Sequence, residues 1–427
     1  MKQKKLRPWS RLDNAAKIFP PASTKDSTNV FRFSCELYEE VDSHTLQQAL
    51  DLTVEQFPAY LSVLKRGMFW YYLEASGLSP IVTADSKPPC SPIYDRNRRT
   101  LLFSVTYFRR RINLEVYHVL ADGTGALQFM RTLVYHYLCI RHQKELAGEL
   151  PLMDYDASAA QKMDDSFKKY YTGKQTSNGK KQREKRCAAY RLKGMRTAER
   201  RIKVIEGIMN TRELVDRAHE YHTTLTVFLT AVLLRAIFEE MPLRARRRPA
   251  VIKVPVDLRN YFPSVSARNF FSIINVGYDF SVQSHELEDI IQGVAASFKE
   301  ELTEENLSRR LNALMAIEQN MFARIAPLTV KDVCMRAAYR FDASGVTATL
   351  SNVGRITMPA ALEPYIRLFD ICVSTNKLQI CMCSFQDNVA VSFTSQFISS
   401  DIQRRFFRTL TQMGIEVELV TNQMDSE

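Results

Sequence analysis

A histidine and an aspartate four residues apart, followed at once by a glycine, are the residues of this chain best suited to chemistry. His118, Asp122 and Gly123 form an HxxxDG hexapeptide, and Gly125 follows two residues later. A neutral imidazole can take a proton from an alcohol near neutral pH, so His118 is the candidate general base. Asp122 is expected to hold the turn, through backbone hydrogen bonds or an arginine. Gly123 is expected to allow a positive φ or a close backbone approach.

The sequence contains none of several other familiar catalytic signatures. A GxSxG elbow for a serine nucleophile, an HExxH zinc motif, a Walker loop and a GxGxxG fingerprint are all missing. The eight cysteines include no CxxC pair, so no metal site is predicted. The competing interpretation of His118 is a hydrogen-bonded core histidine, which is the more common fate of a lone histidine.

The segments that flank the motif predict how the histidine would be held. Residues 111–119 alternate in a β-like pattern that places Leu114, Val116 and His118 on one face of a strand. A glycine-rich turn follows at 122–125, and after it comes an apolar helical pattern. A histidine at the end of a rigid strand, before such a turn, would project into a cleft.

The rest of the chain shows the same mixture of strands and helices in each half. Strict strand–helix alternation is missing, so two α+β lobes are expected rather than a doubly wound sheet. A stretch rich in Lys, Arg and Ser lies between the halves, as in a mobile connection or a surface insertion. The expected division is a first lobe over 1–155, a basic linker or insertion over 156–200, and a second lobe over 201–427.

Periodicity and turn residues predict the other elements. Further strands are expected at 29–37, 61–74, 100–107, 201–209, 250–256, 271–280, 345–350, 367–374, 378–385 and 389–397, and helices at 46–57, 211–218, 226–240, 286–321 and 400–413. Asp42 or Ser43 is expected to cap the first of these helices, and Asp387 with Asn388 to form the last hairpin turn.

Composition limits the partners. The net charge is +11, from 58 Lys and Arg against 47 Asp and Glu, but the basic residues cluster in expected loops, so nucleic-acid binding is not expected. The N-terminal residues are basic without an apolar run and do not form a signal peptide. The apolar stretch 225–238 is shorter than the roughly 20 residues of a membrane span. A cytoplasmic, reducing location is expected, with room for peripheral membrane contact.

Four segments, taken together, resemble the chloramphenicol-acetyltransferase-like superfamily, which includes peptide condensation domains and alcohol acetyltransferases. They are EVYHVLADGTGALQFMRTLV (115–134), SRLDNAAKIFP (10–20), VPVDLRNYFP (254–263) with RNFF (268–271), and TLSNVGRI (349–356). They span nearly the whole chain in the family's order. The segment 10–20 resembles the opening of the bacterial alcohol-acetyltransferase-like branch.

The resemblance implies two similar two-layer α/β sandwich lobes with an active-site tunnel between them. It implies that acyl-CoA and a hydroxyl-bearing small molecule or lipid enter from opposite ends and meet at His118, the general base. Asp122 would be structural and paired with Arg259, and Gly123 would shape the turn. No bound cofactor is implied, because acyl-CoA is a co-substrate, and a monomer would suffice.

The same resemblance places Ser351 and Asn352 near the developing oxyanion, where a hydrogen-bond donor would stabilise it. The sequence also departs from the family. Tyr117 stands where condensation domains usually carry a second histidine, and the DFGWG segment of the plant enzymes is missing. Two alternatives to an acyl-CoA-dependent enzyme therefore stay open: a carrier-protein-dependent condensation enzyme, and a non-catalytic binding or scaffold protein of the same fold.

Overall fold

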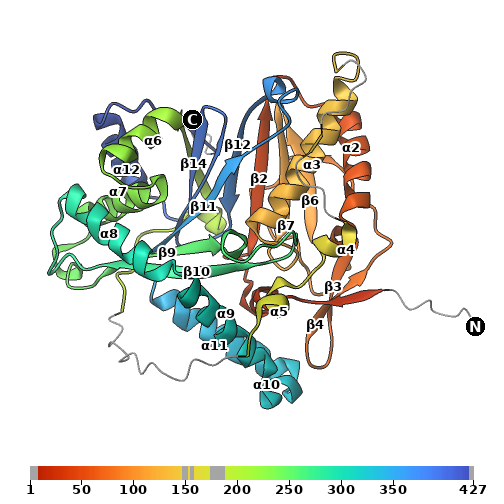
Figure 1. The fold of residues 1–427 in the computed structure, drawn as a ribbon, viewed down its shortest axis with the longest axis horizontal. Coiled ribbons are helices and arrows are strands. Elements are labelled where there is room, and N and C mark those ends of the chain that lie inside the picture. The colour runs from red at the N-terminus through yellow and green to blue at the C-terminus, as the bar shows by residue number, and fades with distance from the viewer. Residues whose placement is uncertain (1–7, 147–151, 154–157, 174–187, 423–427) are drawn as a thin grey trace, which may run out of the picture.

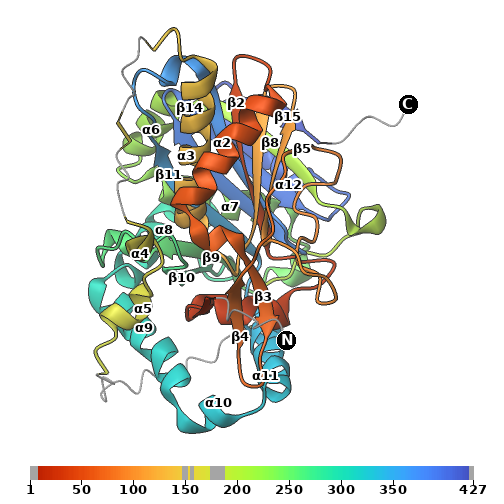
Figure 2. The same cartoon turned by 90° about the vertical axis from the view of Figure 1, so that its right-hand side faces the viewer.

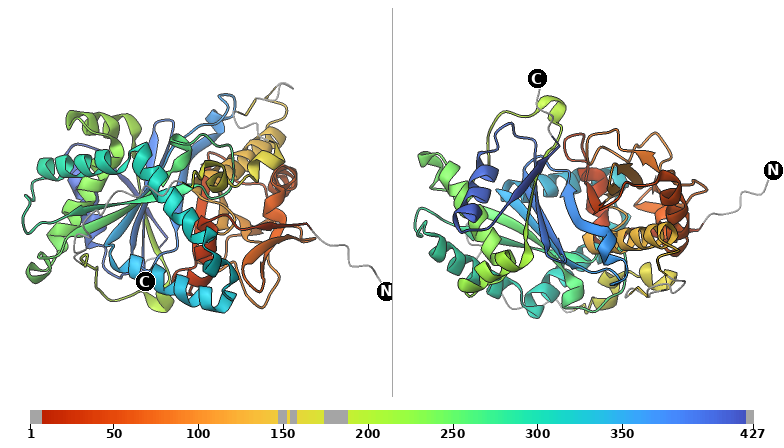
Figure 3. Two further views of the ribbon diagram at one scale, coloured as in Figure 1. Left: turned by 60° about the horizontal axis from the view of Figure 1, so that its bottom comes forward. Right: turned by 90° about the horizontal axis from the view of Figure 1, so that it is seen from above.

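Two lobes, each a β-sheet with helices packed against it, make up the chain in this computed structural model (Figure 1). The structure describes residues 8–146, 152–153, 158–173 and 188–422. Seen from above and from below, the helices of the two lobes lie on opposite flanks, with the strands between them (Figure 3). The expected α+β architecture of two lobes is confirmed.

The first lobe is built on a five-stranded sheet in the order β12-β2-β7-β6-β5. Its strands are β2 (Val30–Leu37), β5 (Thr83–Ala84), β6 (Phe103–Phe108), β7 (Arg111–Tyr117) and β12 (Ile366–Val373). Every residue of β2 is buried, because the strand lies inside the sheet. Helices α2 (Ser43–Gln56) and α3 (Gly123–Arg141) pack against each other. The Asp42 carboxylate caps α2 by accepting from the Thr45 N–H at 2.7 Å.

A strand from late in the chain completes this first sheet. β12 pairs antiparallel with β2, from Ile366 opposite Leu37 to Val373 opposite Phe31. The boundary expected at residue 201 stays a prediction. β12 follows that boundary in the sequence, but it pairs with β2, which precedes it. Within the stretch expected as a linker, the structure describes two short helices, α4 (Ala159–Lys162) and α5 (Ser166–Tyr170).

The second lobe is built on a seven-stranded sheet in the order β10-β9-β11-β13-β14-β8-β15. Its strands are β8 (Lys203–Asn210), β9 (Ala250–Asp257), β10 (Phe271–Tyr278), β11 (Ala348–Ile356), β13 (Leu378–Phe385), β14 (Asn388–Ser395) and β15 (Glu418–Thr421). Its helices are α6 (Thr211–Glu220), α7 (Leu225–Glu240), α8 (Leu287–Glu301) and α12 (Asp401–Gln412). β11 pairs with β9 only at Ala348 and Thr349, so the two strands part beyond that point.

A helical arm extends below both sheets and is seen at the bottom of Figure 2. It consists of α9 (Glu304–Gln319), α10 (Met321–Ile325) and α11 (Leu328–Ser344), and α11 packs on the short α1 (Phe19–Ala22). Beside it lies a three-stranded sheet of β1 (Trp9–Arg11), β4 (Tyr71–Ala75) and β3 (Ser62–Arg66). Short 3-10 helices occur at Ala15–Ile18, Pro58–Leu61, Ala198–Arg200, Leu243–Ala245, Leu258–Asn260 and Glu363–Tyr365.

Two local predictions differ from the structure. The final hairpin turn is at Gln386 and Asp387, one residue earlier than expected, because Gln386 takes the positive φ of 51° and Asn388 already begins β14. No helix was expected over 328–344, where α11 forms. Several apolar side chains of α11 face solvent, so its sequence lacks the single core-facing apolar stripe from which a helix is predicted.

No single helix in the described ranges has the length and hydropathy to cross a membrane. Among the described helices, one pair, α6 and α7 with an 80° bend between them, reaches that length and composition when taken together.

A buried ionic cluster joins the two lobes. Arg111 of β7 contacts Glu36 at 2.7 Å, Glu206 of β8 at 3.1 Å and Asp370 of β12 at 3.0 Å. Three carboxylates therefore surround one guanidinium. Burial, followed by the Asp370 carboxylate, raises the pKa of Glu206 to about 8, although Arg111 opposes the shift.

This raised pKa predicts a pH-dependent loss of stability. A carboxyl group whose pKa is higher when folded contributes its full stability below its unfolded pKa of 4.5 and loses it as the pH rises through about 8. We expect Glu206→Gln, which cannot ionise, to gain stability relative to the wild type between pH 5 and 9, by on the order of a few kcal/mol. Urea unfolding across that range measures it. Glu55→Gln, at an exposed position of α2, is the control, and parallel curves for wild type and Glu206→Gln would contradict the prediction.

Candidate active site

His118 lies directly after β7, where the first lobe meets the second. Its backbone N–H donates to the Asn29 carbonyl at 2.9 Å, which ties this strand end to the residue before β2. The half-buried ring stacks on Phe19 at a centroid distance of 4.5 Å and meets Phe31 edge-on at 5.0 Å. Phe271 of β10 lies 5.7 Å away. Since Phe271 belongs to the second lobe, the imidazole sits between the lobes.

The charge state of His118 suits a base. Burial lowers the pKa of His118 below its ordinary value, and the Asp122 carboxylate and the Asn269 side chain oppose part of that shift. An imidazole with a lowered pKa is neutral at neutral pH, and only the neutral ring can accept a proton.

Two buried polar residues without a predicted role hold one side of this ring. His118 Nδ1 lies 3.1 Å from Asn269 Oδ1, and Asn269 Nδ2 donates to Asp13 Oδ2 at 3.2 Å. Asn269 and Asp13 are each 1% exposed. Both belong to segments that carried the family resemblance, but nothing in their spacing indicated a role, because Asn269 is 151 positions from His118 in the sequence.

Asp122 and Arg259 meet at the same junction. Arg259 Nη1 lies 2.9 Å from Asp122 Oδ2, with the two side chains 10% and 6% exposed. The Asp122 carboxylate also accepts from the backbone N–H groups of Gly125 at 2.8 Å and Phe270 at 2.7 Å. Although burial alone would lower the pKa of Arg259, the carboxylates of Asp122 and Asp257 raise it, so the guanidinium stays charged. This one carboxylate caps α3 and fastens the turn to the second lobe.

The glycine that the turn requires is Gly125 rather than Gly123. A Cβ on Gly125 would lie 2.0 Å from the Ala267 carbonyl oxygen, so no side chain fits there. Gly123 has neither a positive φ nor any atom within 4 Å of the position of a Cβ. The physical reason expected for Gly123 is therefore wrong, because α3 approaches the second lobe two residues further along, at Gly125.

Ser351 and Asn352 lie in β11, on the edge that parts from β9. The Asn352 side chain donates to Thr226 Oγ1 at 2.9 Å and accepts from the Gly354 N–H at 2.8 Å. These bonds direct the amide to the start of α7. The structure thus brings together His118, Asp122 and Arg259, whereas the contacts of Asn352 lie with α7 and its own strand. The role expected for Ser351 and Asn352, and the tunnel between the lobes, stay predictions.

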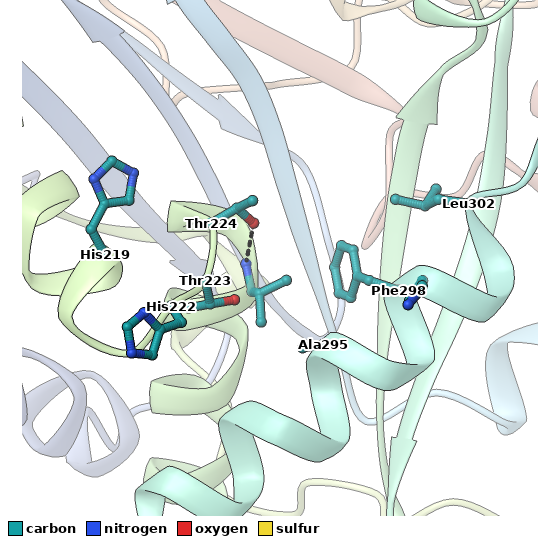
Figure 4. Close-up of a pocket in the computed structure, with 9 residues that line it drawn as sticks. His219, His222, Thr223, Thr224, Ala295, Phe298 and Leu302 are labelled. Atoms are coloured by element: carbon teal, nitrogen blue, oxygen red, sulfur yellow. Dashed lines mark hydrogen bonds between the residues drawn. The ribbon is translucent and has the colours of Figure 1, made fainter.

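A groove of about 590 Å³ lies elsewhere in the second lobe. Figure 4 shows His219 and His222 on one side, from the end of α6 and the following turn, and Phe298 of α8 and Leu302, directly after α8, on the other. Thr224, the N-cap of α7, also lines it. None of the residues predicted for the active site borders this groove.

Comparisons with known proteins rest on structure alone. No protein-family model and no curated protein matches the sequence. Polyketide synthase associated protein 5 from Mycobacterium tuberculosis is similar, with a TM-score of 0.62, 13% identity and coverage of 97% of this chain and 99% of that chain. TRI101 of F. graminearum, solved with coenzyme A and deoxynivalenol, has a TM-score of 0.63, 10% identity and coverage of 96% and 99%.

The first condensation domain of the CDA synthetase is similar over the same extent. Its TM-score is 0.59 at 15% identity, and the match covers 96% of this chain and 97% of that domain. At these identities the likeness concerns the fold. The chain has the two-lobed fold shared by condensation domains and chloramphenicol-acetyltransferase-like acyltransferases.

Proposed function

We propose that this chain is an acyltransferase that moves an acyl group from acyl-CoA to an alcohol, with His118 as the general base. The observation that carries the proposal is the position of the His118 imidazole, which lies between the lobes, hydrogen bonded to Asn269 and beside the Asp122–Arg259 ion pair. The fold adds support, because TRI101 was solved with coenzyme A and a hydroxylated small molecule. The acyl donor enters as a substrate, and no resident cofactor is proposed.

The proposed reaction needs only one proton carrier. Nε2 of His118 takes the proton of the acceptor hydroxyl as its oxygen attacks the thioester carbonyl carbon. The C–O bond forms while the carbonyl electrons move onto oxygen, where a donor from Ser351 or Asn352 would stabilise the oxyanion. The intermediate then collapses, the C–S bond breaks, and the imidazolium returns its proton to the leaving thiolate. The products are an ester and free coenzyme A.

Carrier-dependent condensation is the second candidate, favoured by the likeness to the CDA condensation domain. One observation weighs against it. Tyr117, in the position of the second histidine of those domains, is 1% exposed, and its hydroxyl lies 3.0 Å from Ser23 Oγ. It stacks on Tyr94 at a centroid distance of 5.6 Å, within the first lobe. Position 117 therefore serves packing here. We propose that the acceptor is an alcohol, as the resemblance to the bacterial alcohol-acetyltransferase-like branch implies. The cytoplasmic location stays a prediction.

The proposal is tested by supplying free acyl-CoA. A series of acyl-CoA donors of increasing chain length is incubated with small and lipid-like alcohols, and thiol release and ester formation are both measured. We expect turnover with acyl-CoA and an alcohol and none without the alcohol. Ester formed only from an acylated carrier protein would favour the condensation alternative. A chain that binds acyl-CoA or an alcohol without any turnover would favour a binding protein.

A further inference from the structure

The hydrogen bonds of Asn269 bear on which nitrogen of His118 carries the proton. The Asp13 carboxylate receives the Ala16 N–H at 2.7 Å on Oδ1, and Arg268 Nε lies 3.6 Å from Oδ2. Burial raises the pKa of Asp13, while the Arg268 guanidinium and the Ala16 N–H oppose that rise. Asn269 turns its NH₂ group to Asp13, which lies beside the Arg268 guanidinium, and its oxygen to His118.

An acceptor at Nδ1 requires a proton on that nitrogen. With Nδ1–H donating to Asn269 Oδ1, the lone pair of the neutral ring is on Nε2, which is the form a general base needs. The same oxygen still accepts from Nδ1–H after Nε2 has taken a proton, so it also stabilises the imidazolium. We propose that Asn269 and Asp13 are positioning residues that fix the tautomer and the orientation of His118. This inference deepens the proposed function and rests on it for its kinetic part.

Because both residues are buried, the loss of either side chain would leave its partner without a hydrogen bond. Asn269 and Asp13 are each 1% exposed, so water cannot readily replace a lost partner. Without Asp13, the amide of Asn269 is free to turn and offer N–H to His118, which would favour the tautomer whose Nε2 carries the proton. Asn269 acts on the substrate only through His118, and Asp13 only through Asn269.

Two variants test the role of Asn269. Asn269→Leu keeps the approximate shape of the side chain and removes both hydrogen bonds, and we expect kcat to fall about 100-fold with KM changed less than about threefold. Asn113→Leu is the matched control: Asn113 is 3% exposed, lies in β7 and donates to Asp85 at 3.3 Å, away from the ring. It should lose stability without a comparable loss of kcat.

A swap of the two side chains separates positioning from simple packing. In Asp13→Asn/Asn269→Asp, a carboxylate would accept from His118 Nδ1–H and the new amide would donate to it, so the tautomer is retained. We expect most of the kcat lost in Asp13→Asn to return. The acid limb of the kcat/KM profile should move to higher pH, because an anion beside the ring raises its pKa. A swap no more active than Asp13→Asn, with an unshifted profile, would overturn the proposal.

The tautomer can be read without any activity. ¹⁵N-histidine labelling is practical with seven histidines in the chain, and long-range ¹H–¹⁵N spectra distinguish Nδ1–H from Nε2–H rings. We expect Nδ1–H for the wild type and a mixture for Asn269→Leu. If Asn269→Leu keeps both kcat and the Nδ1–H form, the positioning role is wrong while acyl transfer stands. If no acyl acceptor is found, the spectra still show whether Asn269 fixes the tautomer of His118.

A separate observation concerns the helical arm, whose apolar side chains face solvent. Eight large apolar residues at the end of α9, in α10 and along α11 are between 44% and 80% exposed: Leu314, Ile317, Met321, Phe322, Ile325, Val330, Val333 and Phe341. We call these residues the arm surface. On α11, Val330, Val333, Ala337 and Phe341 recur at helical spacing on one exposed face. Soluble proteins rarely leave so many apolar side chains uncovered in one segment.

The charges of the arm indicate what would cover it. Residues 314–341, which span the arm surface, contain four basic residues and two acidic ones: Glu318, which pairs with Lys17, and Asp332, which is buried and bonded to Tyr71 at 3.0 Å. Arg324 and Arg340 are exposed beside the apolar side chains. A symmetric contact with a second copy would bring both copies of these cations into one interface, and residues 314–341 offer no exposed acidic side chain to pair with them. An anionic lipid bilayer instead accepts apolar side chains and cations together.

The arm is also attached to the active site. The inner face of α11 packs on α1, where Arg336 Nε donates to the Pro21 carbonyl at 3.2 Å, and Phe19 of α1 stacks on His118. The tip of the β3–β4 hairpin joins the same surface, since the Met68 carbonyl accepts from the Leu328 N–H at 2.9 Å. We infer that the arm surface docks on an anionic membrane.

Vesicle sedimentation tests this docking without any assay of activity. The full chain should sediment with vesicles of phosphatidylglycerol and phosphatidylcholine, and poorly with phosphatidylcholine alone or at about 0.5 M salt. Phe322→Ser/Ile325→Ser should weaken binding by about tenfold or more. Leu243→Ser/Val282→Ser is the matched control, because these residues are 79% and 81% exposed in the second lobe.

Two results would overturn the membrane proposal. One is equal sedimentation of the wild type and the Phe322→Ser/Ile325→Ser variant. The other is a dimer in sedimentation velocity that this variant dissociates, which would make a second copy of the chain the partner of the arm surface.

Discussion

Replacing His118 with alanine is expected to lower kcat for ester formation from acyl-CoA by about 10²- to 10⁴-fold, the usual contribution of a general base. The fold should persist, because the half-buried ring is held by packing and one side-chain hydrogen bond rather than by an ion pair. Steady-state kinetics with the best donor and alcohol, together with a CD melting curve, measure both effects.

The matched control for this variant is His136→Ala. His136 lies on α3 of the same lobe, and its ring is hydrogen bonded to the exposed Gln56 at 3.0 Å. It should keep wild-type kcat. The pH profile gives a second check, because the lowered pKa of His118 predicts that activity persists below the usual titration range of histidine. Full activity in His118→Ala would refute the mechanism.

Replacing Arg259 with methionine is expected to lower the free energy of unfolding by about 3–5 kcal/mol, because it leaves a buried carboxylate unpaired. The Asp122 side chain is 6% exposed, so water cannot readily take the place of the guanidinium. Arg259 also donates to the backbone carbonyls of Ser266 and Arg268, at 2.9 and 2.6 Å, and those bonds are lost as well. Urea unfolding monitored by fluorescence measures the change.

Two further variants show whether the buried pair is the cause. Arg404→Met removes an exposed arginine paired with Asp401 one helical turn away, and should change stability by less than about 0.5 kcal/mol. Asp122→Asn/Arg259→Met should be more stable than Arg259→Met, since it removes the unpaired charge. Equal losses for Arg259→Met and Arg404→Met would show that the ion pair does not hold the lobes.

Much of the local structure follows from the sequence by itself. The strand that leads to His118, the turn at Asp122 and the helix after it were predictable, because alternation, an N-cap and helical periodicity are local signals. The apolar helix 226–240 and the paired strands 378–385 and 389–397 were predictable for the same reason. The order of four matching segments also predicted two lobes of this superfamily fold.

The surroundings of the histidine depended on tertiary structure. Asn269 contacts His118, and Asp13 contacts Asn269, only because a loop of the second lobe and the N-terminal segment converge there. Spacing carries no information about contacts between residues 151 and 256 positions apart. The need for glycine at 125 rather than 123 comes from the Ala267 carbonyl, which the second lobe supplies.

The sequence therefore determined which residue could act as a base and which elements would present it, since those depend on local propensity and side-chain type. The tertiary structure decided its tautomer, its lowered pKa and the exposed face of α11. Hydrogen bonds to distant groups, desolvation and solvent exposure arise only when separate segments pack together.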